Sequence, residues 1–357
     1  LSAGTAVLRA TAADGTTNTV ALPTRVATLG TANYANNAEF GEPTDNDPSD
    51  DLILRHLEFT ASYNRIKGEP NWVSYDLDAS HFGPEDRCDC FTADPALPPD
   101  FPHFTTNDYT GSGAIAGYGI DRGHLARSFD RTSGSLDNAF TFYLSNIIPQ
   151  AADLNQGPWA QFENYLGDRA RFDNREVYII AGGAGNKGTL KNEGKIVIPA
   201  SMWKVAIILP VDQGLASIQS FQDVEVVAVI IPNDPGIRNV PWQSYETTVN
   251  AVEALSGYDL LALLSDRIEI AVESDARQEL SDAQVLVDQL VAAHALDVGD
   301  AQWIHNKLDI ATKLLDQADV AAVVNQLQEV LRRLADAGPG VAPLATVMQR
   351  FIQSLTS

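Results

Sequence analysis

The sequence predicts an α+β domain followed by a small all-α bundle, and three observations carry this prediction. First, 45% of the 357 residues are hydrophobic, which suffices for one large core or two smaller ones. Second, residues 34–275 mix strand-like apolar runs with a few helical ones, separated by many Gly, Pro and Asn residues, which is typical of an α+β fold. Third, from Ala276 onward the apolar residues recur at helical spacing.

The N-terminal segment, residues 1–33, is predicted to be β-like and to end in a linker. It is rich in Ala, Thr and Val, and polar and apolar residues alternate over 5–9, a pattern that favours strands. We interpret it as one or two strands, such as the end of an upstream β-domain.

The central segment, residues 34–275, is predicted to fold as one domain around a sheet. Its apolar runs bury enough surface to exclude intrinsic disorder. The candidate strands are residues 72–76, 176–181, 195–199, 204–209 and 223–231.

The C-terminal segment, residues 276–357, is predicted to be a helical bundle. Apolar side chains recur three or four residues apart, which places them on one face of a helix. They are Val323, Leu327, Val330, Leu331 and Leu334 in one helix, and Leu344, Met348, Phe351, Ile352 and Leu355 in the next. Gly338-Pro339-Gly340 separates these two helices. The segment holds no cluster of potential ligands or nucleophiles, so we expect the chemistry to lie upstream.

Composition excludes several classes of protein. Lys and Arg number 24 against 47 Asp and Glu, a net charge of −23, so the chain does not bind nucleic acid by bulk attraction. Binding a polyanion would need a local positive cleft, for which the candidates are Arg87, Arg122, Arg127 and Arg131. Two cysteines exclude a disulfide scaffold and a four-thiolate zinc module. No stretch approaches the roughly 18 uncharged apolar residues of a membrane span.

The first candidate site is Asp121-Arg122-Gly123-His124. If this segment is extended, Arg122 and His124 share one face and Asp121 lies on the other. Gly123 between them would let a ligand or neighbouring backbone approach closely. A cation beside an imidazole suits attack on a phosphate, since one neutralises charge and the other accepts a proton. A structural histidine beside an arginine is the alternative.

The second candidate site lies 22 residues further on and comprises residues 144–150, residues 153–159 and Glu163. Its candidate ligands are Asn155 and Glu163. Pro158 suits a first helical turn, and residues 159–166 have helical composition. In one continuous helix the two side chains would be about 12 Å apart along the axis, too far to ligate one ion directly. They could flank one hydrated ion, and Mg²⁺ keeps several of its waters in such sites. Alternatively, Asn155 caps a helix and Glu163 is solvated.

Taken together, these motifs resemble the Serratia-type non-specific DNA/RNA endonucleases of the ββα-metal superfamily. The pattern runs from Asp-Arg-Gly-His through Ser-Asn-Ile-x-Pro-Gln at 145–150 to Asp-Leu-Asn-Gln-Gly-x-Trp-Ala-x-x-Glu at 153–163. Similar segments extend the resemblance to about residues 40–270, including a late strand at 198–205 and a closing helix at 248–261. It implies a ββα-metal core with a central antiparallel sheet.

The resemblance implies a role for each matching residue. His124 is the general base that activates water. Asn155 is the single side-chain ligand of Mg²⁺, or of Mn²⁺ in its place, and Glu163 holds metal-bound water. Arg87 and Arg122 contact the scissile phosphate.

Two further positions in the resemblance are less direct. Asn146 matches a family asparagine near the site. The family carries an arginine four residues after the glutamate, where this chain has Gly167. Arg169 or Arg171 is a candidate substitute for that phosphate contact.

Cys88 and Cys90 flank one residue next to Arg87. A bridge between them would close a small ring and hold Arg87 in place in an oxidising compartment. Two unbridged thiols are the alternative.

The function implied is hydrolysis of phosphodiester bonds in DNA and RNA as substrates. One alternative is a catalytically degenerate nucleic-acid-binding or surface protein on the same scaffold, and another is a nuclease restricted to one polymer. The helical tail resembles modules appended to extracellular bacterial enzymes, and a non-specific nuclease endangers its own cell. We therefore expect a secreted bacterial protein.

Overall fold

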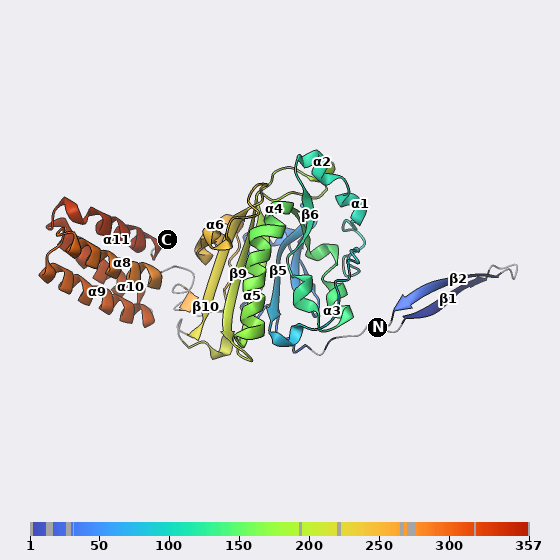
Figure 1. Ribbon diagram of the computed structural model, residues 1–357, viewed down its shortest axis with the longest axis horizontal. Coiled ribbons are helices and arrows are strands. Elements are labelled where there is room, and N and C mark those ends of the chain that lie inside the picture. Colours follow the sequence, from blue (N-terminus) through green and yellow to red (C-terminus); the bar gives the residue numbers. More distant parts are fainter. Residues whose placement is uncertain are drawn as a thin grey trace.

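The structure, a computed structural model, describes residues 3–11, 17–25, 30, 32–192, 195–219, 223–264, 268–269, 276–317 and 319–355. Figure 1 shows a central sheet with its covering helices, a separate group of helices α8–α11, and a hairpin β1–β2. The predicted fold class, an α+β domain with a central antiparallel sheet plus a helical C-terminal region, is confirmed. No helix in the described ranges combines the length and apolar character that crossing a membrane requires.

The central sheet has seven antiparallel strands in the described part of the chain, in the order β11-β10-β9-β8-β5-β4-β3. The strands are β3 (Leu52–Arg55), β4 (Thr60–Asn64), β5 (Glu69–Leu77), β8 (Arg175–Ala184), β9 (Ser201–Pro210), β10 (Glu225–Pro232) and β11 (Glu246–Thr247). Four of the five predicted strands lie within or overlap β5, β8, β9 and β10. Their near-continuous apolar runs reflect burial of the sheet on both faces.

The predicted strand at 195–199 is wrong. Only a single bridge, Thr189 to Val197, forms there, and Pro199 has no N–H with which to extend a ladder. The apolar run instead reflects burial, because Ile196 and Ile198 pack in a small core with Phe104.

Helices cover both faces of the sheet. On one face, Val73, Ile179 and Ile208 share a core with residues of α5 (Ala160–Phe172). On the other, Ile180 and Val205 pack with α6 (Val249–Ser256). This second helix was expected over 248–261. It ends at Ser256 because Gly257 adopts a left-handed φ of 83°.

A two-stranded sheet carries the first motif. Strand β6 (Ile120–His124) pairs antiparallel with β7 (Ile147–Ala151), and the chain continues through α4 (Ala152–Leu154) and the π-helical turn η5 (Asn155–Trp159) into α5. This order of two strands and a helix is the ββα arrangement that the resemblance implies.

The remaining elements of the body are short. They are η1 (Pro48–Asp50), η2 (Ala79–His81), α1 (Thr106–Tyr109), α2 (Ser112–Ala116), η3 (Ser128–Arg131), α3 (Ser135–Phe140), η4 (Leu144–Asn146), η6 (Leu190–Asn192), η7 (Leu215–Ser217) and η9 (Trp242–Tyr245). The turn η3 follows β6 and contributes Ser128 and Phe129 to the wall of the cavity described below.

The C-terminal helices pack on one another. They are α8 (Ala276–Ala292), α9 (Val298–Asp316), α10 (Val320–Ala335) and α11 (Ala342–Ser354), with η10 (Pro339–Val341) before the last. Each contacts the next, and α11 returns to α8. The predicted helical spacing is confirmed, since Val323, Leu327 and Phe351 are fully buried.

The N-terminal hairpin consists of β1 (Ala3–Thr11) and β2 (Thr17–Arg25), which pair antiparallel. Two strands therefore lie in the segment predicted to be β-like. The predicted domain limits at residues 33/34 and 275/276 stay predictions, and residue 275 lies outside the described residues.

Candidate active site

One cavity of about 480 Å³ brings the two candidate motifs together. Five of the six predicted site residues line it: Arg87, Arg122, His124, Asn155 and Glu163. Its walls come from the loop before Arg87, the end of β6, the turn η3, and the segment that joins η5 to α5. Side chains more than thirty residues apart in sequence therefore face one space.

Strand β6 aligns the first motif as alternation predicts, since Arg122 and His124 line the cavity and Asp121 does not. Gly123 provides the close approach that was expected, but to a side chain of the partner strand. A Cβ at this position would collide with the Gln150 side chain. The Gln150 side chain thus occupies the space that a side chain at position 123 would need.

His124 is buried, with 8% of its surface exposed, and its ring packs edge-on against Phe142 at 4.8 Å between centroids. Burial, followed by the positive charges of Arg87 and Arg122, lowers the pKa of His124 to about 3. The imidazole is therefore neutral near pH 7. Its Nε2 is buried without a hydrogen-bond partner, and a neutral imidazole keeps one unprotonated nitrogen that can accept a proton.

The two arginines are each held against an aromatic ring. The Arg122 guanidinium lies 4.1 Å from the centroid of Phe91, and that of Arg87 lies 4.8 Å from Phe142. Arg87 also donates to Ser128 Oγ at 2.8 Å. Stacking fixes the guanidinium planes while leaving N–H donors for an anion.

Cys88 and Cys90 form a disulfide, which decides between the two alternatives left open by the sequence. Asp89 between them has a φ of 50° and accepts a hydrogen bond from Arg87 Nε at 2.7 Å. The Cys88 N–H donates to Asn138 Oδ1 at 2.8 Å. The bridge and these bonds restrain the loop that carries Arg87.

Asn155 is oriented by Asp121, a residue to which the sequence assigned no role. The Asp121 carboxylate accepts hydrogen bonds from Asn155 Nδ2 at 2.8 Å and from Gln156 Nε2 at 2.7 Å. Because an ionised carboxylate only accepts, the amide nitrogen must face Asp121. This leaves the Asn155 Oδ1 oxygen for the cavity.

Asn155 and Glu163 do not lie on one continuous helix. Gly157 has φ −113° and ψ −116° inside η5, which breaks the helical path. A Cβ there would lie 2.6 Å from the Arg238 carbonyl oxygen, so only glycine fits. Both side chains consequently line the same cavity, and their oxygen atoms suit a hard, largely hydrated cation such as Mg²⁺.

Glu163 is held from behind by Lys204, the most important residue that the sequence analysis missed. Lys204 is fully buried, donates from Nζ to Glu163 Oε1 at 2.9 Å, and lies 4.2 Å from the centroid of the Trp159 ring. Arg127 Nε lies 3.5 Å from Glu163 Oε2. The signal was a single charged residue inside the apolar run of β9, which indicates a buried partner.

Asn146 does not reach the cavity. It is fully buried, donates from Nδ2 to the carbonyls of Ala126 and Thr141, and accepts from the Ala126 N–H, all at 2.8 Å. The Asn146 amide is thus fully bonded to backbone groups, two of them on Ala126, just after His124. Asn146 positions the end of β6 and does not line the site.

The local positive cleft predicted from the sequence contains fewer arginines than expected, because Arg131 does not line the cavity. Arg131 is fully buried, forms an ion pair with Asp76 and donates to the Glu58 carbonyl. The cleft contains the other three candidates, Arg87, Arg122 and Arg127, which all line the cavity.

Neither suggested substitute for the missing family arginine lines the cavity. Arg169 pairs with Asp173 and Glu225, and Arg171 pairs with Asp168. Arg127 is the third cation that the cavity contains.

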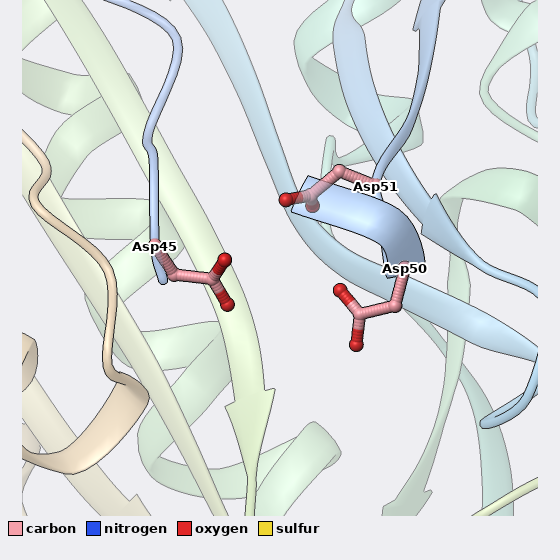
Figure 2. Close-up of side chains that lie close together, drawn as sticks. All are labelled: Asp45, Asp50 and Asp51. Carbon is pink, nitrogen blue, oxygen red and sulfur yellow. The ribbon is translucent and has the colours of Figure 1, made fainter. Parts of the chain in front are cut away.

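A cluster of three aspartates lies elsewhere, at η1 and the start of β3. Figure 2 shows the carboxylates of Asp45, Asp50 and Asp51 turned toward one another. Asn64 Nδ2 donates to Asp50 at 2.7 Å and the Tyr258 hydroxyl donates to Asp51 at 3.0 Å. None of the three lines the cavity, so the cluster is separate from the candidate active site.

Comparisons with known proteins identify the family of this chain. A profile described as DNA/RNA non-specific endonuclease matches residues 36–267. A nuclease of Nostoc sp. is 37% identical over 233 residues, which cover 65% of this chain and 81% of the relative. A nuclease of Serratia marcescens is 30% identical over 256 residues, covering 70% of this chain and 88% of the relative.

A solved structure shares the fold. A chain in the crystal structure of the EndoG/EndoGI complex aligns with a TM-score of 0.52 and 20% identity, covering 65% of this chain and 92% of its own length. This likeness shows the fold of the matched region.

Proposed function

The chain belongs to the DNA/RNA non-specific endonuclease family, and we propose that it hydrolyses phosphodiester bonds in both polymers with His124 as the general base and Mg²⁺ bound through Asn155. The observation that carries this proposal is the single cavity. It sets a neutral, buried imidazole beside two arginines and faces them with an amide oxygen and a carboxylate.

The reaction follows from the chemistry of a phosphodiester. The neutral His124 ring accepts a proton from the attacking water, whose oxygen forms the new bond to phosphorus as the bond to the 3′-oxygen breaks. Arg87 and Arg122 neutralise the charge that develops on the phosphate oxygens. When bound, Mg²⁺ supplies Lewis-acid stabilisation of the same charge and of the departing oxygen.

Lack of sequence preference is the natural consequence of this site. The groups assigned to catalysis address the phosphate and not the base edges, and phosphate contacts carry no sequence information. A catalytically degenerate scaffold would not need a buried imidazole next to two arginines. Here the charges of Arg87 and Arg122 contribute to lowering the pKa of His124. Such an arrangement costs stability and is typical of functional sites.

The deciding experiment is digestion of plasmid DNA, single-stranded DNA and RNA with Mg²⁺ and with chelator. We expect all three to be cut with Mg²⁺ and none with chelator. Cleavage of only one polymer would establish a restricted nuclease. Binding without cleavage at any Mg²⁺ or Mn²⁺ concentration would establish the degenerate scaffold.

Asn155→Ala is expected to raise the Mg²⁺ concentration needed for half-maximal rate, by at least the 10- to 100-fold typical of losing a group that only supports a ligand. The reason is that the variant removes the amide oxygen assigned to the ion. Titrating Mg²⁺ against the initial rate measures this shift. Asn186→Ala is the matched control, because it removes an exposed asparagine amide that does not line the cavity. An unchanged Mg²⁺ dependence in Asn155→Ala would show that another group binds the ion.

We also propose that the protein works outside the bacterial cell. The Cys88–Cys90 disulfide supports this, because disulfides persist in oxidising compartments. The hazard of a non-specific nuclease to its own cell supports the same location.

A further inference from the structure

Two exposed phenylalanines flank the Arg171 guanidinium, and one of them lines the cavity of the candidate active site. Phe129, in η3, is 44% exposed and lines the cavity, and Phe172, at the end of α5, is 72% exposed. A single exposed phenylalanine needs no explanation, but two beside one guanidinium form a patch. An exposed apolar patch close to a candidate active site is typical of a surface that binds a ligand.

Arg171 ties these rings together. Its guanidinium carbon lies 5.3 Å from the centroid of Phe129, 4.8 Å from Phe172 and 4.9 Å from Phe82. Phe82 also meets Phe129 edge-on at 5.8 Å. The patch is therefore a continuous surface of aromatic rings and a planar cation.

Arg171 is held in place by two hydrogen bonds. Its Nη2 donates to Asp168 Oδ1 at 2.7 Å, and its Nε donates to the Gly167 carbonyl at 3.3 Å. These bonds use two of the five guanidinium N–H groups and fix the plane of the group beside the rings. On the cavity side, Arg127 lies 5.1 Å from the centroid of Phe129, so the patch runs directly into the cationic wall.

We propose that Phe129, Arg171 and Phe172 form a stacking subsite that takes an unpaired nucleobase of the strand being cut. The subsite rests on the proposed function, because it presumes a nucleic-acid substrate in the cavity. Every nucleobase presents a flat π-face, so aromatic rings and guanidinium planes bind bases regardless of sequence. In a duplex, neighbouring base pairs cover these faces. The subsite therefore favours single-stranded DNA and RNA over duplex without adding sequence specificity.

The test replaces the most exposed ring and compares two substrates. In Phe172→Ala, and more so in Phe129→Ala/Phe172→Ala, we expect the KM for a single-stranded oligonucleotide to rise about 5- to 100-fold relative to the KM for the same sequence as duplex. Ile66→Ala is the matched control, since Ile66 is 79% exposed but does not line the cavity. We expect it to leave the KM ratio unchanged. Thermal unfolding of each variant verifies that the fold is intact.

A binding measurement separates failure of the subsite from failure of the proposed function. A single-stranded oligonucleotide carrying 2-aminopurine loses fluorescence when that base stacks, and the full chain is titrated with it in chelator. We expect quenching by the native chain and by Ile66→Ala, and its loss in Phe172→Ala. Quenching without cleavage in Mg²⁺ would retain the subsite and refute the nuclease.

Two outcomes would overturn the subsite alone. In the first, the native chain cleaves its substrates but does not quench the probe, and the double variant has the same KM ratio as the native chain. The second is a change of oligomeric state in Phe172→Ala by sedimentation, which would identify the patch as a contact between copies of the chain.

Discussion

We expect His124→Ala to lower the rate of phosphodiester cleavage by about 10²–10⁴-fold while substrate binding is retained. The variant removes the only histidine that lines the cavity, while Arg87, Arg122 and Asn155 remain to hold the substrate and the ion. The loss should fall on kcat, because a proton acceptor acts in the transition state and contributes little to ground-state binding. Initial rates on a defined oligonucleotide, together with binding measured in chelator, distinguish a loss of kcat from a loss of substrate binding.

His56→Ala is an informative control for this effect. His56 is also largely buried, but its Nε2 binds Asp94 at 2.7 Å and it does not line the cavity. We expect its replacement to affect stability more than kcat. Turnover near the native level in His124→Ala would refute the assignment of the general base.

We expect Lys204→Met to lower the free energy of unfolding by about 3–5 kcal/mol. Burial lowers the pKa of the Lys204 ammonium, and the Glu163 carboxylate opposes this shift. Removing the ammonium leaves Glu163, which is 7% exposed, with only Arg127 nearby at 3.5 Å. A buried charge that loses its partner cannot regain the hydration that it gave up on folding. Urea denaturation of the purified variant measures the change.

The double variant Lys204→Met/Glu163→Gln tests the reason for this loss. Because it removes the unpaired charge together with its partner, we expect much of the lost stability to return. Lys313→Met is the surface control, since Lys313 is exposed in α9, and its effect should stay within about 0.5 kcal/mol. Equal destabilisation in the single and double variants would mean that Lys204 acts by packing against Trp159, and not by pairing with Glu163.

The sequence predicted the local geometry of the first motif well, because strand alternation depends only on the backbone. Arg122 and His124 share a side in the structure as they do in the pattern. The geometry of the second motif was not predictable in the same way. A continuous helix places Asn155 and Glu163 about 12 Å apart along its axis, whereas Gly157 interrupts that helix where the chain passes the Arg238 carbonyl. That carbonyl comes from a segment about 80 residues away, which no local pattern reveals.

Residue type alone also failed to separate structural cations from those of the site. Arg127 and Arg131 are four residues apart and were predicted to have the same role. Arg127 lines the cavity, while Arg131 is fully buried against Asp76 and the Glu58 carbonyl. The turn η3 directs one outward and the other inward.

The sequence by itself determined the fold class, the helical character of the C-terminal segment, and the pairing of an imidazole with an arginine on one strand face. These follow from periodicities of two and 3.6 residues, which are properties of the local backbone. Only the tertiary structure decided that Lys204 holds Glu163, that Asp121 orients Asn155, and that Asn146 serves the backbone. Each of these three hydrogen bonds joins residues 20 to 41 positions apart. The free energy of such contacts depends on burial and on which partner is within reach, and both exist only once the sheet and α5 have packed together.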